Sequence, residues 1–235
     1  RSVSELLRSD ARTLRQATKN LNDGISLINV AEGGLNEQTS ILTRLREVLS
    51  VAGGAIDQNT RGTLQLEINT LKDEFNRIAT GTDFIGLKLL DGTLGRSVTT
   101  SKQITISTGL NSDEESQLNL NKLVDIESTD TSSLGLDGIS TSSFEKSVDS
   151  LAQVEAAQET ILGYRASIGA TQNRLVRALA TLNVSVENLY AANSVISDAD
   201  IAEEVANLTK QQLLVQSSAA MVGQDNLIPE GVLLL

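Results

Sequence analysis

Carboxylates are the only side chains in this sequence whose number and spacing suggest reaction chemistry. They cluster at residues 113–115, at Asp198 and Asp200, and at Glu203 and Glu204. Neighbouring carboxylates can hold a metal ion or act as a general acid and base. However, no glycine-rich phosphate loop accompanies them, and the 113–115 cluster lacks the spacing of an EF-hand. Solvated helix ends and a hairpin tip explain them better, so we predict no catalytic site, no metal site and no cofactor.

The residue types that are missing narrow the chemistry further. Without Cys or His the chain has no zinc finger, no disulfide and no Ser-His-Asp triad. Lys and Arg number 19 against 30 Asp and Glu, which gives a net charge of −11 and makes nucleic acid an unsuitable partner. No apolar run approaches the roughly 20 residues that would cross a bilayer. We therefore predict neither nucleic-acid binding nor membrane insertion.

Two long segments repeat a large aliphatic residue at every seventh position, which is the pattern of packed, coiled helices. The first segment spans residues 1–50 and the second spans residues 148–196. The first repeat consists of Leu7, Leu14, Leu21, Ile28, Leu35, Leu42 and Leu49. The second consists of Val154, Ile161, Ile168, Leu175, Leu182, Leu189 and Ile196.

The remaining segments are shorter. Residues 56–80 predict a third helix, and Gly53 and Gly54 before it predict an antiparallel helical hairpin. Residues 81–96 are rich in turn formers, and 97–123 alternate as a β-hairpin does. Residues 127–143 are rich in Ser and Thr and are predicted to form a loop. We interpret their hydroxyls as groups that contact solvent, in preference to sites of O-linked glycosylation. Ser142 and Glu145 resemble a capping box that opens the long C-terminal helix.

The fold class that follows is mainly α: an elongated helical bundle of heptad-patterned helices with a small β-hairpin region. We expect the N-terminal helical part at 1–96, the hairpin and loop at 97–142, the long helix at 143–196 and a terminal segment at 197–235. Residues 197–200 should interrupt the long helix and cap another one. The single proline, Pro229, should lie beyond the last long helix.

The terminal segment repeats the heptad pattern at Ile201, Leu208, Val215 and Val222 and ends in an apolar tail. Such a helix needs a partner, which three arrangements would supply: this chain's own bundle, a membrane surface or an assembly. Membrane-surface helices carry Lys and Arg on their polar face, whereas the basic residue here is Lys210 alone. The membrane surface is therefore the weakest of the three.

Several motifs, in the same order along the chain, resemble bacterial flagellin. They are NDGIS at 22–26, AEGGL at 31–35, LTRLREV at 42–48, FIGLKLLDG at 84–92, GATQNRL at 169–175 and SDADIA at 197–202. The resemblance spans nearly all of the chain outside 97–142. It departs from the family pattern where Ile85 replaces the common asparagine of an FNG motif. By the same resemblance, the N-terminal inner-core segment and the large outer domains are absent.

The resemblance implies a secreted, extracellular subunit that polymerises with itself into the filament of the flagellum. It implies contacts with the filament cap and hook-associated proteins, and an export chaperone on the C-terminal helix. It also implies recognition by the vertebrate Toll-like receptor for flagellin. Receptor candidates are Arg44, Glu47, Val48 and Glu67, and subunit-contact candidates are Arg165, Gln172, Asn173, Arg174 and Asp198. Chaperone or inner-core candidates are Ile201, Val205, Leu208, Val215, Val222 and Leu233.

Two alternatives to a filament subunit stay open. The first is the flagellin-like junction protein between hook and filament, which shares the helical framework. The second is a secreted coiled-coil adhesin or other binding module. An enzymatic flagellin with an inserted HExxH metallopeptidase is excluded because the sequence contains no His.

Overall fold

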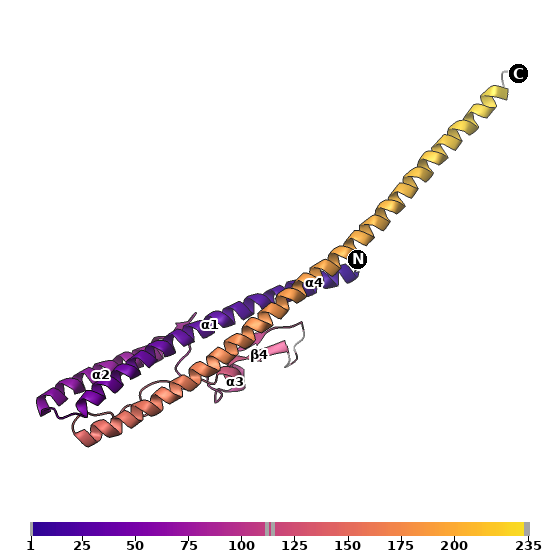
Figure 1. Ribbon diagram of the computed structural model, residues 1–235. Coiled ribbons are helices and arrows are strands. Elements are labelled where there is room, and N and C mark those ends of the chain that lie inside the picture. The colour runs from indigo at the N-terminus through magenta and orange to yellow at the C-terminus, as the bar shows by residue number, and fades with distance from the viewer. Residues whose placement is uncertain (1, 111–112, 114–115, 233–235) are drawn as a thin grey trace. The chain divides into compact units, whose positions relative to one another are not determined.

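The computed structural model describes residues 2–110, 113 and 116–232, and its long helices confirm the mainly α prediction (Figure 1). By its internal contacts the chain divides into two compact units. Residues 13–183 form one, called here the core unit. Residues 1–12 together with 184–235 form the other, the terminal unit.

The helical hairpin predicted from Gly53 and Gly54 is present, with α1 at Ser2–Ala52 and α2 at Gln58–Gly81. Its turn is held from both sides. Asp57 accepts the backbone N–H of Thr60 at 3.2 Å and so caps the start of α2. Arg61, which is 9% exposed, donates to the carbonyl of Ala52 and to that of Gly54 at 3.1 Å. The guanidinium thereby satisfies carbonyls that the end of α1 leaves without helical partners.

The helix α4 runs without interruption over Phe144–Val232, so the predicted break at residues 197–200 is wrong. Ser and Asp cost well under 1 kcal/mol each inside a helix, and propagation from an existing helix is cooperative, so these residues do not end it. The capping prediction is off by one residue, because Ser143 accepts the N–H of Lys146 at 3.2 Å. Pro229 also lies inside α4 rather than beyond it, close to its end, where a proline removes one backbone donor.

Within residues 13–183 the two heptad repeats form the apolar interior of the core unit, in which α1, α2 and α4 lie side by side (Figure 1). The predicted repeat residues Leu7, Leu189 and Ile196 belong to the terminal unit and are only half-buried. From α2, Ile68 and Phe75 are both fully buried against them. Because burying one such side chain contributes about 1.5–3 kcal/mol, these seams dominate the stability of the unit. The repeat residues that are at most 8% exposed are Leu14, Leu21, Ile28, Leu35, Leu42, Leu49, Val154, Ile161, Ile168, Leu175 and Leu182.

Two small antiparallel sheets join α2 to α4. In the first, β1 (Asp83–Phe84) pairs with β2 (Leu87–Lys88). In the second, β3 (Thr105–Ser107) pairs with β4 (Gln117–Asn119), which confirms the predicted β-hairpin. Ile106 and Leu118 face each other there and are both buried. The sequence analysis missed the 3₁₀ helix η1 (Thr100–Lys102) and the short helix α3 (Leu120–Val124).

The Ser/Thr-rich loop before α4 is less solvated than its composition suggests. Thr129, Thr131 and Thr141 are at most 4% exposed, and each forms hydrogen bonds. The hydroxyl of Thr141 donates to the carbonyl of Arg61 at 2.9 Å, which ties the loop to the start of α2. These threonines are therefore part of the packed interior, because their polar atoms find partners in neighbouring elements.

Candidate interaction surfaces

The described members of the carboxylate clusters that opened the sequence analysis lie on the surface, whereas Glu114 and Glu115 and the side chain of Asp200 lie outside the description. Asp113, Asp198, Glu203 and Glu204 are all exposed. Over the described residues, no group of three or more acidic side chains is placed to hold a metal ion. The helices in the same ranges include none that is both long and apolar enough to cross a membrane. The remaining candidate residues are those that the sequence analysis predicted for contacts with other macromolecules.

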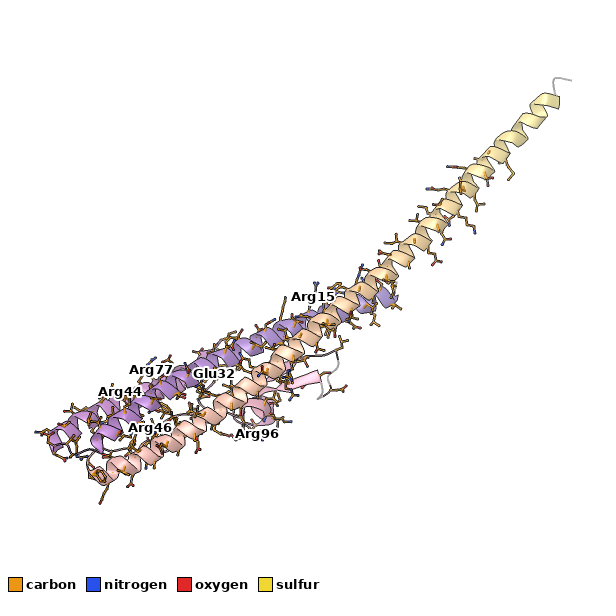
Figure 2. The ribbon with its side chains drawn as sticks, in the orientation of Figure 1. Arg15, Glu32, Arg44, Arg46, Arg77 and Arg96 are labelled. Atoms are coloured by element: carbon orange, nitrogen blue, oxygen red, sulfur yellow. The ribbon has the colours of Figure 1, made fainter. Side chains whose placement is uncertain are left out.

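An exposed group of charges joins α1 to α2 in the core unit (Figure 2). Arg44 on α1 donates through Nε to Glu67 Oε1 on α2 at 2.8 Å, and through Nη1 to Glu47 Oε2 at 2.9 Å. The hydrogen bond to Glu67, followed by the one to Glu47, raises the pKa of the Arg44 guanidinium above its ordinary value. Three of the four receptor candidates thus form one surface cluster.

The fourth receptor candidate does not belong to that surface. Val48 is 3% exposed and packs in the apolar interior. One helical turn of α1 carries both kinds of residue, because side chains at neighbouring positions point about 100° apart around a helix. The position of Val48 in this chain is therefore corrected from the receptor surface to the core.

The five subunit-contact candidates fall into two groups. Arg165 and Gln172 bond within the core unit. Arg165 Nε donates to Oε1 of Glu32, which is labelled in Figure 2, at 3.0 Å. Gln172 Nε2 donates to Asn29 Oδ1 at 2.8 Å. Both bonds join α4 to α1 and fix how the two helices align. The second group projects outward, since Asn173, Arg174 and Asp198 are all exposed.

An exposed apolar stripe runs along the C-terminal part of α4 in the terminal unit. Its side chains follow spacings of three, four and seven residues, so they share one face of the helix. Each of them is more than half exposed, at values between 54% and 69%. Leu233, the last candidate on this helix, lies outside the described residues. The stripe consists of Ile201, Val205, Leu208, Val215 and Val222.

Three residues have roles in the structure that the sequence analysis did not predict. Gln38 on α1 is fully buried and donates through Nε2 to Thr129 Oγ1 at 3.0 Å. It lies three residues after Leu35 on the apolar seam, and a polar residue at a seam position was a signal that sequence alone offered. Arg61 gave no such signal, because its role depends on a turn carbonyl. Ile85 was noted as a departure from the FNG motif, but its positive φ angle was not predicted.

The chain has long heptad helices, an exposed apolar stripe and charged groups on its surface. Together these features define a class of helical protein that associates with other chains. Comparison with known proteins makes this specific. The profile of the bacterial flagellin N-terminal helical region matches residues 1–94, and that of the bacterial flagellin C-terminal helical region matches residues 151–235. The chain therefore belongs to the bacterial flagellin family.

Individual relatives agree with this assignment. The chain is 36% identical to the flagellar filament 30.7 kDa core protein of Treponema maltophilum, with 99% of this chain and 82% of that protein covered. It is also 36% identical to flagellin of Bacillus subtilis (strain 168), with 100% and 84% covered. The crystal structure of Bacillus cereus flagellin superposes with a TM-score of 0.58 at 26% identity, covering 74% of this chain and 94% of that one.

A putative flagellar hook-associated protein from Vibrio parahaemolyticus shares the fold as well. It superposes with a TM-score of 0.63 at 14% identity and covers 81% of this chain and 94% of its own. At that identity the likeness concerns the fold alone.

Proposed function

We propose that this chain is a structural subunit of the flagellar filament, which polymerises with copies of itself outside the cell and catalyses no reaction. The observation that carries the proposal is the family match at both helical ends, together with the similarity over nearly the full length to a filament core protein. An extracellular filament also requires secretion, which the family membership supports for this chain.

The apolar stripe on α4 is the surface that we assign to the most extensive contact. Five aliphatic side chains that are more than half exposed have much to gain from burial, at about 25 cal/mol for each Å² removed from water. In the filament the stripe would pack against helices of neighbouring subunits. Before assembly, an export chaperone would cover the same stripe, since an exposed apolar face is prone to aggregate.

The outward-facing polar residues provide smaller contacts. We assign Asn173, Arg174 and Asp198 to the interfaces between subunits, because each is exposed. Arg165 and Gln172 act on the same interfaces indirectly, by holding α4 in register with α1. A head-to-tail interface of this kind extends a filament without closing a ring. The growing end would also meet the filament cap and hook-associated proteins.

A second surface on the core unit suits recognition by the vertebrate Toll-like receptor for flagellin. Arg44, Glu47 and Glu67 bridge α1 and α2 at the exterior, so a partner can meet both helices at once. The test is binding of the purified receptor ectodomain to the full chain by surface plasmon resonance. Arg44→Ala should weaken binding at least severalfold. Arg77→Ala is the matched control, because Arg77 also forms an ion pair with a glutamate, Glu74, and its loss should leave binding unchanged.

Seeded elongation tests the filament role itself. Purified protein is added to sheared flagellar filaments of the same bacterium, and growth is followed by light scattering and electron microscopy. Elongation supports a filament subunit, whereas protein that binds seed ends and never extends them supports the junction protein. Protein that stays monomeric in the presence of seeds supports the binding-module alternative.

The contribution of the apolar stripe is tested in the same assay. Leu208→Asp places a charge on the stripe and should abolish elongation and chaperone binding together. Leu66→Asp is the matched control, because Leu66 is a 68% exposed leucine on α2, away from the stripe. Equal behaviour of the two variants would refute the assignment of the stripe to these contacts.

A further inference from the structure

The turn between β1 and β2 places an unusual residue in an unusual conformation. Its two central residues are Ile85 and Gly86, with φ angles of 53° and 80°. This arrangement, with both φ angles positive, is the turn for which Asn-Gly is strongly preferred. Gly86 fits it, whereas a β-branched isoleucine in the left-handed region is a rare outlier.

No burial within the described part of the chain compensates for this conformation. Ile85 is 89% exposed, so its side chain gains almost no burial in exchange for the backbone strain. The turn is otherwise regular, with the N–H of Gly86 donating to Asp83 Oδ2 at 3.1 Å. Residues held in sparsely populated regions of φ and ψ concentrate at contact sites, where another molecule supplies the compensation.

An apolar pocket of matching size opens beside this turn, since Phe84, the residue before Ile85, is part of its lining. Its volume is about 190 Å³, which equals about six water molecules and accommodates the four-carbon side chain of isoleucine. Gly24 lines it from α1, and Thr105 lines it from β3 at an exposed position. The apolar lining comes from Leu27, Phe84, Ile104, Ile106 and Leu120.

The charges beside the two features are complementary. Lys88 lies three residues after Ile85 on β2 and is exposed. Asp23 is exposed as well and belongs to the lining of the pocket. A side chain that enters the pocket with a neighbouring lysine would therefore meet an acid of opposite charge, which favours this orientation over others.

We propose that Ile85 of one copy of this chain inserts into the pocket of a second copy, with Lys88 of the first near Asp23 of the second. The inference rests on the proposed filament function and adds a specific contact to it. Every subunit carries one inserting residue and one pocket. Repetition of the same contact therefore fills every pocket along a row of subunits, as an open head-to-tail interface requires.

A double-mutant cycle on the full chain tests this contact. Ile85→Asn removes the inserting side chain, and Thr105→Phe fills the mouth of the pocket from an exposed strand position, where an aromatic residue is well tolerated. Each variant is measured by the critical concentration for elongation of seeds. We expect each single variant to raise it by about 10- to 100-fold, which is the equivalent of one buried isoleucine side chain. The double variant should be no worse than either single one, because both changes remove the same contact.

The controls separate this contact from general effects. Leu66→Asn removes an exposed aliphatic side chain on α2 and should leave the critical concentration unchanged. Lys88→Asp should raise it severalfold, and adding Asp23→Lys should restore it. Thermal unfolding of each monomer establishes that the variants are folded, and Ile85→Asn should be at least as stable as the parent.

The outcomes are distinguishable from those of the filament proposal. Elongation by Ile85→Asn at the parental critical concentration overturns the contact while leaving the filament role intact. Additive losses in the double variant overturn the pairing of Ile85 with this pocket. If the parent protein itself does not extend seeds, the filament role and this contact are refuted together.

Discussion

The packing of the β3–β4 hairpin on α1 should depend on one absent methyl group. A Cβ atom built at Gly24 would lie 2.1 Å from Ile106 Cδ1, whereas the next atoms, Ile106 Cγ1 and Leu175 Cδ1, are at 3.5 and 4.0 Å. Optimal carbon contacts are about 3.5–4.0 Å, so the overlap is confined to a single atom. Ile106 is only 7% exposed, so its Cδ1 atom can relieve the overlap only by turning into the adjoining pocket, at the expense of its present packing.

The magnitude follows from two opposing effects. Gly24→Ala gains up to about 1 kcal/mol of helix propensity and loses about 1–3 kcal/mol to overpacking. The net expectation is a loss of about 1 kcal/mol. Ile106→Val removes the Cδ1 atom at a cost of about 0.5–1.5 kcal/mol. In that background the overlap is gone, so Gly24→Ala should stabilise by about 0.5–1 kcal/mol. The sign of one substitution therefore reverses with the residue at 106.

The assay is urea unfolding followed by far-ultraviolet circular dichroism for the four members of the cycle. Gly33→Ala is the control, because Gly33 is exposed on the same helix and a Cβ there would meet nothing within 4 Å. It should stabilise equally in both backgrounds. The reasoning would be refuted if Gly24→Ala changed stability by the same amount and sign whether residue 106 is Ile or Val. Ile106 would then move aside without a cost in stability.

Three further predictions concern stability. Ile85→Asn should raise the free energy of unfolding by about 1 kcal/mol and the Tm by about 2–4 °C, because Asn tolerates the positive φ angle. Ile85→Leu is the control and should show no such gain. Arg61→Met keeps the apolar stem and loses the bonds to Ala52 and Gly54, so urea unfolding should report a loss of about 2 kcal/mol; an unchanged midpoint contradicts this. Hydrogen bonds from Thr60 lower the pKa of Asp57, so the contribution of this carboxylate to folding stability is present above about pH 4 and is lost as the pH falls through the lowered pKa. The difference in stability between the parent and Asp57→Asn should therefore shrink over that range, and a constant difference would argue against the cap.

The stability prediction at Ile85 and the proposed contact point in opposite directions. The same substitution should make the monomer more stable and the filament weaker. Such an opposition is expected wherever a residue is kept for a contact rather than for folding. It also makes the interpretation robust, because loss of folding cannot imitate it.

Sequence periodicity determined the elements of this protein that depend on local pattern. The heptad seams of α1 and α4, the hairpin at Gly53 and the pairing of β3 with β4 all follow from residues spaced along one segment. Hydrophobic burial acts on whichever face such spacing creates, so the pattern specifies the element before any partner is known. The ordered motifs likewise pointed to flagellin before the comparisons did.

Only the tertiary structure decided what each polar or special residue does. Periodicity did not reveal that Arg165 bonds to Glu32, a residue 133 positions earlier in the chain. Nor did it reveal that Gln38 is buried and bonded to Thr129. It also left open the unbroken course of α4, because mildly unfavourable residues inside a long helix do not reveal whether the helix ends there. The positive φ angle of Ile85 is set by the pairing of two strands, whereas the sequence showed only that isoleucine replaces the asparagine of the FNG motif. Local spacing defines which residues share a face, whereas the partner that meets the face is fixed in three dimensions.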